Sequence, residues 1–199
     1  MRLFKLLRIL LSLLLFSAFL TACNEKSQPV VFQNTDVTGL AYAKDFALND
    51  FNGKLRTLAD FKGKVVVIFF GYTQCPDVCP TTMSDLAGAM KQLGPLADKV
   101  QVLFITVDPE RDTPKLLAQY VPAFDPRFLG LAGDMPATEK VAKDFHVFYQ
   151  KVPGKEPGSY SIDHSAGMYV YDTQGRIRLF ARSGQGIDTL VHDLRLLLS

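Results

Sequence analysis

The sequence predicts an α/β fold in which helices flank a central mixed sheet, and three observations support this class. Residues 65–70 form an apolar run of β-branched and aromatic side chains with the length of a fully buried strand. Strand-like segments then alternate with helix-like segments, as they do when helices cover both faces of a sheet. Two late strand-like runs flank residues 172–175, a sequence that is typical of a hairpin turn.

The first elements of the predicted domain are a hairpin, the buried strand and a helix. Residues 46–58 suit a hairpin around a turn at 49–53, which we expect as an N-terminal extension of the sheet. The central strand 65–70 follows this hairpin. Proline is favoured in the first turn of a helix, so Pro80 and the periodic residues behind it predict a helix over 80–93.

The remaining elements alternate in the same way. An apolar run over 100–107 predicts a second central strand. Thr113 and Pro114 supply an N-cap and a first-turn proline for a helix that ends near Tyr120. Further on we expect a strand at 128–131, a helix at 138–145, a hairpin of strands 166–171 and 176–181, and a closing helix at 187–198.

Two cysteines lie where the central strand turns into the following helix. The segment 71–80 is Gly-Tyr-Thr-Gln-Cys-Pro-Asp-Val-Cys-Pro, which places Cys75 and Cys79 four residues apart. We expect Cys79 beside the helix N-cap, where unpaired backbone N–H groups and the helix dipole favour the thiolate. A thiolate attacks disulfides and binds soft metal ions. A structural disulfide is the alternative, but a bridge around so few residues would constrain the unfolded chain little.

A dithiol at such a junction points to the thioredoxin-like fold and draws attention to the histidines. The chain has three of them, and His146 and His192 lie at or within predicted helices without forming a motif. His164 stands just before the predicted strand 166–171, and in thioredoxin-like folds this segment passes beside the cysteines. Ordinary dithiol enzymes of the fold carry a cis-proline there, whereas this chain has no proline after Pro157.

The donor set Cys75, Cys79 and His164 is therefore the predicted metal site. Two thiolates and one imidazole form a soft set of three donors, which favours Cu(I) and can still hold Cu(II). Zinc accepts the same donors but usually takes a fourth ligand, and no other cysteine of the domain is available to supply it. The alternative for His164 is a loop histidine that bonds to a backbone carbonyl.

The N-terminus has the pattern of a bacterial lipoprotein signal peptide. Three basic residues precede the apolar segment 9–20, and the tetrapeptide Leu-Thr-Ala-Cys that ends at Cys23 resembles the lipobox, in which the cysteine is lipidated. An uncut signal anchor with an incidental thiol is the alternative, but the apolar segment is short for a membrane-spanning helix. Either arrangement places the globular part outside the inner membrane, facing the periplasm of a bacterial cell envelope.

We expect three regions along the chain. A lipoprotein signal peptide covers 1–22, the lipidated cysteine and a polar tether cover 23–42, and a thioredoxin-like copper-binding domain covers 43–199. Removal of the signal peptide takes away three positive charges and no negative charge, which turns the formal net charge from +2 to −1. A nearly neutral domain gives no electrostatic reason to bind nucleic acid.

Three segments together resemble the signature blocks of the Sco/SenC family of copper chaperones. They are the cysteine segment 71–80, the sequence Val-Asp-Pro-Glu-Arg-Asp-Thr-Pro at 107–114, and Asp-His-Ser at 163–165. The resemblance runs in order from about Phe46 to Leu198, which is nearly the whole predicted domain. Each block alone is only suggestive, whereas all three in sequence are specific.

The resemblance implies a function and a set of partners. It implies a thioredoxin-like domain that binds copper through Cys75, Cys79 and His164 and helps to assemble the binuclear copper centre of a respiratory cytochrome c oxidase. The implied partners are the oxidase subunit that carries this centre, and another periplasmic copper chaperone or a thiol–disulfide reductant. Many members carry a single transmembrane anchor, so a lipid on Cys23 would change the attachment and not the chemistry.

Residues 108–114 have a structural interpretation of comparable weight. Asp-Pro followed by Thr-Pro is good turn and N-cap chemistry, and the charged residues between them suit a local ion-paired loop. The segment follows the strand beside the dithiol strand, so it lies near the site. We expect it to shape the site or to contact a partner, and not to bind the metal.

Two functions from different classes follow from these residues. In the first, the protein is a metallochaperone rather than an enzyme and passes copper on by ligand exchange. In the second, it is a thiol–disulfide reductase in which Cys75, the more exposed thiol by position, attacks and Cys79 resolves the mixed disulfide. A peroxidase of the peroxiredoxin kind is a weaker third interpretation. His164 favours copper, because disulfide exchange requires no third ligand.

Overall fold

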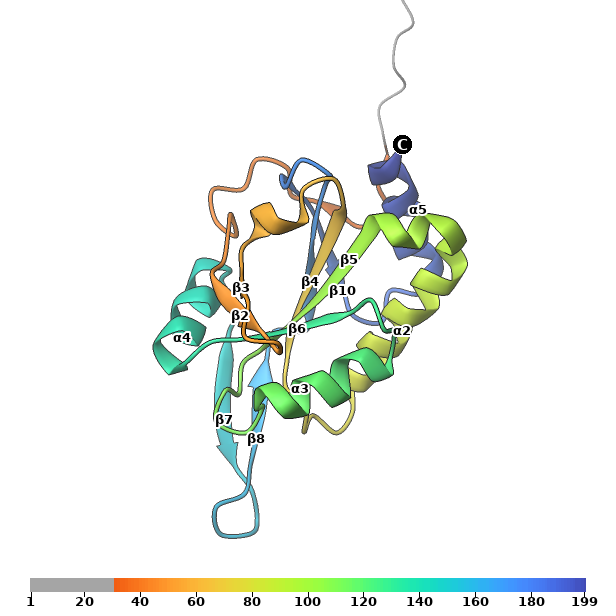
Figure 1. Cartoon of the computed structure of the whole chain (residues 1–199). Helices are drawn as coiled ribbons and strands as arrows, with labels where there is room; N and C mark the ends of the chain where they lie inside the picture. Colours follow the sequence, from red (N-terminus) through yellow and green to blue (C-terminus); the bar gives the residue numbers. More distant parts are fainter. Residues whose placement is uncertain (1–30) are drawn as a thin grey trace, which may run out of the picture. The chain divides into compact units, whose positions relative to one another are not determined.

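A mixed sheet of eight strands organises residues 31–199, which the computed structural model describes (Figure 1). In chain order the strands are β1 (Thr35–Asp36), β2 (Leu48–Asp50), β3 (Leu55–Arg56), β4 (Val65–Gly71), β5 (Val100–Thr106), β6 (Leu129–Ala132), β7 (Tyr149–Pro153), β8 (Tyr160–His164), β9 (Gly167–Tyr171) and β10 (Ile177–Arg182). The order across the sheet is β1-β10-β9-β4-β5-β6-β2-β3, and β7 and β8 pair separately as a hairpin that projects from the domain.

The central strand β4 determines where the site lies. All seven of its residues are buried, and it pairs in parallel with β5 and antiparallel with β9. Burying each such apolar side chain stabilises the fold by roughly 1.5–3 kcal/mol relative to leaving it exposed. Gly71 at the end of β4 pairs with Thr106 at the end of β5, so the loops that follow these two strands begin side by side.

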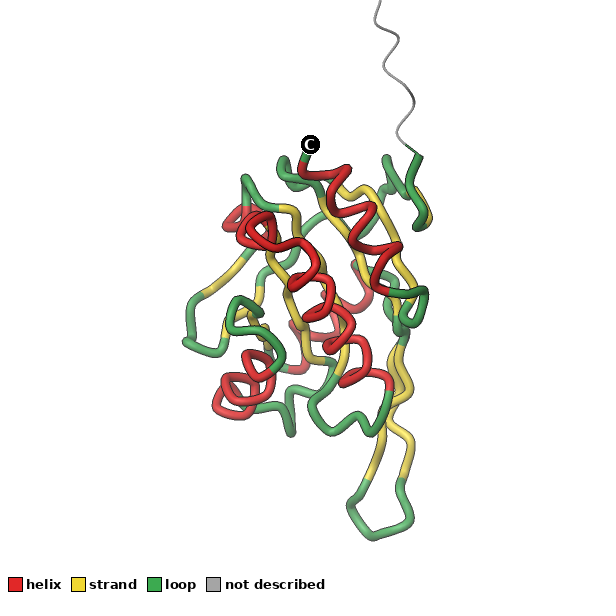
Figure 2. The backbone as a smooth tube through the Cα atoms, turned by 90° about the vertical axis from the view of Figure 1, so that its right-hand side faces the viewer, coloured by secondary structure: helices red, strands yellow, loops and turns green. Residues whose placement is uncertain are grey.

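Within residues 31–199, four α-helices accompany the sheet: α2 (Val78–Leu93), α3 (Pro114–Tyr120), α4 (Met135–Asp144) and α5 (Ile187–Leu198). The helices α2 and α5 pack against each other, and Figure 2 shows them running side by side over the strands. Thr113 caps α3 as predicted, by accepting a hydrogen bond from the backbone N–H of Leu116 at 3.2 Å. The predicted mixed sheet with flanking helices is confirmed, including the N-terminal hairpin of β2 and β3.

Helix α4 and the β7–β8 hairpin differ from the sequence prediction. Helix α4 begins at Met135 and not at 138, because Asp134 caps it and Pro136 lies within its first turn. The hairpin of β7 and β8 was not predicted at all, since nine of its ten strand residues are at least partly exposed and show no alternation of apolar and polar side chains.

The segment from Phe32 to Tyr42 packs on the domain, whereas the sequence prediction included it in the tether. Strand β1 pairs with β10 at the sheet edge. The backbone N–H groups of Gln33 and Asn34 donate to the buried Asp193 carboxylate of α5 at 2.9 and 2.8 Å. The predicted signal peptide, Cys23 and the rest of the tether lie outside the described residues. No helix within residues 31–199 has the length and apolar character needed to cross a membrane.

Candidate metal centre

The loop between β4 and α2 holds both cysteines. Cys75 lies in this loop and is partly exposed, while Cys79 lies in the first turn of α2 and is fully buried. The backbone N–H of Cys79 donates to the Sγ atom of Cys75 at 3.4 Å. Both thiols are free, so the start of the helix brings two sulfur donors to one point.

The third donor comes from β8, because His164 is the last residue of that strand. We expected it on a loop, and the unpredicted hairpin accounts for the difference. Its Nε2 atom lies 3.3 Å from the Sγ atom of Cys79, and its Nδ1 atom lies 3.0 Å from the carbonyl oxygen of Ser165. A carbonyl can only accept, so Nδ1 carries the hydrogen and the Nε2 lone pair faces the thiol.

The structure brings together all three residues of the predicted metal site. The ligand atoms of Cys75, Cys79 and His164 all lie within 4.8 Å of one another. Burial lowers the pKa of His164, so the imidazole is held in the neutral form that binds metals. Two sulfurs and one neutral imidazole are a soft donor set that fits copper.

The protonation of Cys79 differs from the sequence expectation. The helix N-terminus was expected to favour its thiolate. Burial instead raises the pKa of Cys79 well above its ordinary range, and a hydrogen bond from the backbone N–H of Tyr72 only partly opposes this effect. Desolvation therefore outweighs the helix terminus at this position, and a metal ion must displace the thiol proton in order to bind.

Gly71 makes room for the buried sulfur. A Cβ atom at this position would lie 2.8 Å from the Sγ atom of Cys79 and 3.0 Å from the ring of Phe104. Only glycine allows this close approach between the end of β4 and the first turn of α2. The role of Gly71 was not predicted from the sequence, although a glycine in a strand often marks the close approach of another segment.

Aromatic rings enclose the imidazole. The rings of Phe69 and Tyr72 meet the ring of His164 edge-on, at centroid distances of 6.2 and 5.9 Å. The hydroxyl of Tyr72 accepts a hydrogen bond from the backbone N–H of Ile162 at 3.2 Å. This contact fastens β8 to the cysteine loop, so the histidine is positioned by packing and by hydrogen bonds from both sides.

The Asp112 carboxylate ties the loop after β5 to the cysteine loop. It accepts hydrogen bonds from the backbone N–H and the hydroxyl of Thr73, at 3.0 and 2.6 Å. It also accepts one from the hydroxyl of Thr106 at 2.6 Å. Asp112 is buried and contacts none of the three donors through a hydrogen bond or ion pair. These contacts agree with the expectation that residues 108–114 shape the site.

The loop after β5 also contacts the β7–β8 hairpin. Tyr160 donates a hydrogen bond from its hydroxyl to the carboxylate of Asp108 at 2.8 Å. Arg111 pairs with Asp108, donates to the carbonyl oxygen of Tyr160 at 2.8 Å, and stacks on the Tyr160 ring at 3.5 Å from the centroid. The hairpin carries His164, so the contacts of Asp108 and Arg111 with Tyr160 help to position this third donor.

The other two histidines lie apart from the donors. His146 follows α4 and stacks on Tyr42 with ring centroids 3.9 Å apart. His192 lies in α5, where its Nδ1 atom is 2.8 Å from the carboxylate of Asp193. Neither joins the site, in agreement with the prediction that they form no motif with the cysteines.

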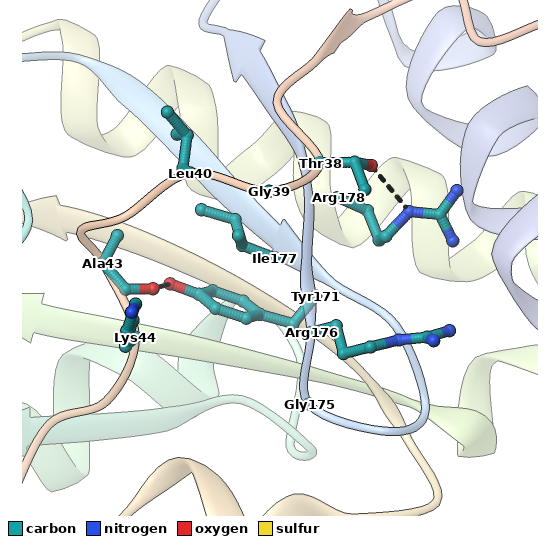
Figure 3. Close-up of a pocket in the computed structure, with 10 residues that line it drawn as sticks. All are labelled: Thr38, Gly39, Leu40, Ala43, Lys44, Tyr171, Gly175, Arg176, Ile177 and Arg178. Atoms are coloured by element: carbon teal, nitrogen blue, oxygen red, sulfur yellow. Dashed lines mark hydrogen bonds between the residues drawn. The ribbon is translucent and has the colours of Figure 1, made fainter.

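A pocket of about 500 Å³ lies at the opposite end of the sheet (Figure 3). Residues 38–40, 43 and 44 line it together with Tyr171 of β9 and residues 175–178 of the β9–β10 turn and the start of β10. The hydroxyl of Tyr171 donates to the carbonyl oxygen of Ala43 at 2.7 Å. Tyr171 pairs with Val66 near the start of β4, whereas the sulfur donors follow the end of this strand. Its described lining holds no cysteine or histidine, so this pocket is separate from the metal centre.

Comparison with known proteins gives one family. The family model described as SCO1/SenC matches residues 35–199. The mouse mitochondrial protein SCO2 homolog is 35% identical over 182 residues, which cover 89% of this chain and 71% of the mouse protein. The bovine SCO2 homolog is 43% identical over 133 residues, which cover 66% of this chain. This match spans only 50% of the bovine protein.

Solved structures agree with this match. The structure of Bradyrhizobium japonicum ScoI with copper bound is 42% identical and covers 77% of this chain and 98% of that one, with a TM-score of 0.71. The solution structure of apo Sco1 from Thermus thermophilus is also 42% identical and covers 84% of this chain and 98% of that one, with a TM-score of 0.75. The thioredoxin-like fold that the sequence predicted is confirmed.

Proposed function

The chain belongs to the SCO1/SenC family, and from this premise we propose that it is a copper-binding metallochaperone that delivers copper to the binuclear copper centre of a respiratory cytochrome c oxidase. The observation that carries the proposal is the convergence of Cys75, Cys79 and His164, whose ligand atoms lie within 4.8 Å of one another. A related ScoI, 42% identical, is known with copper bound, which supports the same cargo for this donor set.

The unequal burial of the donors suits a protein that releases its metal. Cys79 is buried and His164 is held through the carbonyl of Ser165, so these two donors are fixed. Cys75 lies in a partly exposed loop and is the donor that an incoming ligand reaches first. Transfer would then begin with the exchange of Cys75 for a cysteine or histidine of the oxidase subunit, with copper held by the other two donors.

We place the protein at a membrane of a bacterial cell envelope, with its domain facing the periplasm. The lipobox-like tetrapeptide that ends at Cys23 supports a lipid anchor, and residues 1–22 would be removed as a signal peptide. Since residues 32–42 pack on the domain, the tether proper would be confined to residues 24–31. Another periplasmic copper chaperone or a thiol–disulfide reductant would load or reduce the site.

A thiol–disulfide reductase remains the second candidate, and the partly exposed free thiol of Cys75 beside the buried free thiol of Cys79 favours it. The Cys75 thiolate would attack a target disulfide, form a mixed disulfide and release one target thiol. Cys79 would then displace the second target thiol, which leaves a Cys75–Cys79 disulfide and a dithiol target two electrons more reduced. This activity needs no histidine, so His164 distinguishes the two functions.

Copper titration of the purified protein tests the metallochaperone. We expect one copper ion per chain for the unmodified protein and loss of tight binding in both Cys75→Ser and Cys79→Ser, because thiolates supply the soft donors. A serine variant that retained stoichiometric, tight copper would contradict the three-donor site. Unfolding of the metal-free variants, followed by circular dichroism, separates loss of the site from loss of the fold.

A further inference from the structure

The outer edge of β7 carries backbone groups that have no hydrogen-bond partner among the described residues. The N–H of Ser165 donates to the carbonyl oxygen of Phe148 at 2.9 Å, which fixes the residues of the hairpin that bond across it. In an antiparallel pair the alternate residues point their N–H and C=O groups away from the neighbouring strand. The backbone groups of Tyr149 and Lys151 therefore face outward from the hairpin, where no described residue bonds to them.

The outer edge of β8, in contrast, is closed by side chains. The backbone N–H of Ile162 donates to the hydroxyl of Tyr72 at 3.2 Å, and the carbonyl oxygen of Tyr160 accepts from Arg111 at 2.8 Å. The hairpin therefore has one open edge, on the side of β7. Because the hairpin projects from the domain (Figure 1), a strand of another molecule can reach this edge.

Two exposed apolar side chains accompany the open edge. Phe148 is 59% exposed and Val152 is 36% exposed. Side chains an even number of residues apart in a strand point to the same face, so both lie on one face of the hairpin, on either side of Gln150. The opposite face carries Ile162, which is buried against the domain. The exposed face thus offers apolar contacts in addition to the free backbone groups.

The sequence of β7 is complementary to a second copy of itself. When two copies pair antiparallel with Gln150 opposite Gln150, Tyr149 of each copy stands opposite Lys151 of the other. These are the residues with free N–H and C=O groups, so each pair forms two hydrogen bonds. In the same register Phe148 of each copy stands opposite Val152 of the other, and such aromatic and β-branched pairs stabilise antiparallel sheets.

We propose that β7 is a contact between two copies of this chain, which joins their β7–β8 hairpins into one antiparallel sheet of four strands. The inference goes beyond the proposed function and does not depend on copper. The ammonium of Lys151 pairs with Glu110 at 2.6 Å, so the contact brings no unpaired charge to the edge. Pro153 has no N–H and ends the free edge. So short a contact is transient, with a dissociation constant on the order of 0.1–1 mM.

Sedimentation velocity of the purified metal-free protein, at concentrations up to about 1 mM, tests the contact and its register. Phe148→Lys and Val152→Glu, each alone, should raise the dissociation constant about two- to thirtyfold, because each change removes both symmetry-related apolar pairs. The double variant should recover the dimer, since opposite charges then face each other between copies. Within one chain the two positions are about 13 Å apart along the strand, too far to pair with each other.

Salt and a second edge strand provide the controls. Raising the salt concentration should weaken the dimer of the double variant more than that of the unmodified protein. Leu55→Lys should leave association unchanged, because Leu55 is also 59% exposed but lies in the edge strand β3. A protein that stays monomeric at about 1 mM would overturn the proposal. So would single variants without effect, a double variant that associates no better than they do, or an equal loss in Leu55→Lys.

Discussion

At the scale of single residues, His164 shows how a backbone contact selects the chemistry of a side chain. The carbonyl of Ser165 holds Nδ1, so Nε2 faces the thiol of Cys79 as a lone pair. Burial keeps the ring neutral. A histidine that only stabilised the loop would not need its second nitrogen to be directed at a sulfur atom, so this orientation is what links the residue to metal binding.

We expect His164→Ala to lose Cu(II) far more than Cu(I). Two thiolates alone can hold Cu(I) in a nearly linear arrangement, whereas Cu(II) requires further nitrogen or oxygen donors. Titration of the purified variant with each oxidation state measures the difference, and cells that carry the variant should fail to assemble the oxidase although both thiols are intact. His146→Ala, which removes an exposed histidine distant from the donors, is the control. Unchanged Cu(II) spectra and normal oxidase copper would support the reductase instead.

Gly71→Ala should disturb the site without replacing any of its three ligands. The added methyl group would lie 2.8 Å from the Sγ atom of Cys79 and 3.0 Å from the ring of Phe104, and both neighbours are packed in the core. Overpacking of this kind costs about 1–3 kcal/mol, and we expect weaker copper binding together with lower stability in urea. Gly88→Ala is the control within α2, because there the methyl group meets only the far end of the Ile187 side chain. Equal behaviour of the two variants would show that Gly71 has no special role.

At the scale of elements, the β7–β8 hairpin and the loop after β5 form one unit. Asp108 and Arg111 hold Tyr160, and Asp112 holds Thr73 of the cysteine loop. A single short loop therefore contacts both segments that carry donors. This arrangement keeps the histidine in register with the cysteines although their segments are far apart in the chain.

Tyr160→Phe should loosen this unit. The substitution removes the hydroxyl that donates to the buried Asp108 carboxylate, and a hydrogen bond to a charged group contributes about 1.5–3 kcal/mol. We expect lower stability in urea, faster amide hydrogen exchange in β7 and β8, and weaker copper binding. Tyr149→Phe alters the same hairpin and leaves the Asp108 contact intact. If exchange in the hairpin were unchanged by Tyr160→Phe, the hairpin would be held by other contacts.

The elements differ in how far the sequence determines them. The strand 65–70 and the cap at Thr113 depend on local composition, so the sequence predicts β4 and the start of α3 closely. The hairpin carrying His164 depends on contacts with Asp108 and Arg111, which no local pattern reveals. Two further features are properties of the packed molecule. They are the close approach of Gly71 to the Sγ atom of Cys79 and the burial that raises the pKa of Cys79.

At the scale of the whole molecule, the proposed lipid anchor and the metal site use separate parts of the chain. We expect Cys23→Ser to release the protein from the membrane or to leave it unprocessed, and to leave its copper affinity unchanged, because the anchor and the site share no residues. Membrane fractionation and lipid labelling measure the first effect, and copper titration measures the second. Lipid that persisted on the Cys23→Ser protein would show that the anchor lies elsewhere.

The hydrogen bonds from the backbone of Gln33 and Asn34 to the Asp193 carboxylate determine where the described chain begins relative to the metal centre. The described chain begins near the end of α5, whereas α2 begins, with its cysteines, at the opposite end of the domain (Figures 1 and 2). The sixteen residues of α2 span about 24 Å between these ends. The proposed copper donors therefore lie at the end of the domain away from residue 32, and a recipient can reach them without contacting the segment at which the described chain begins.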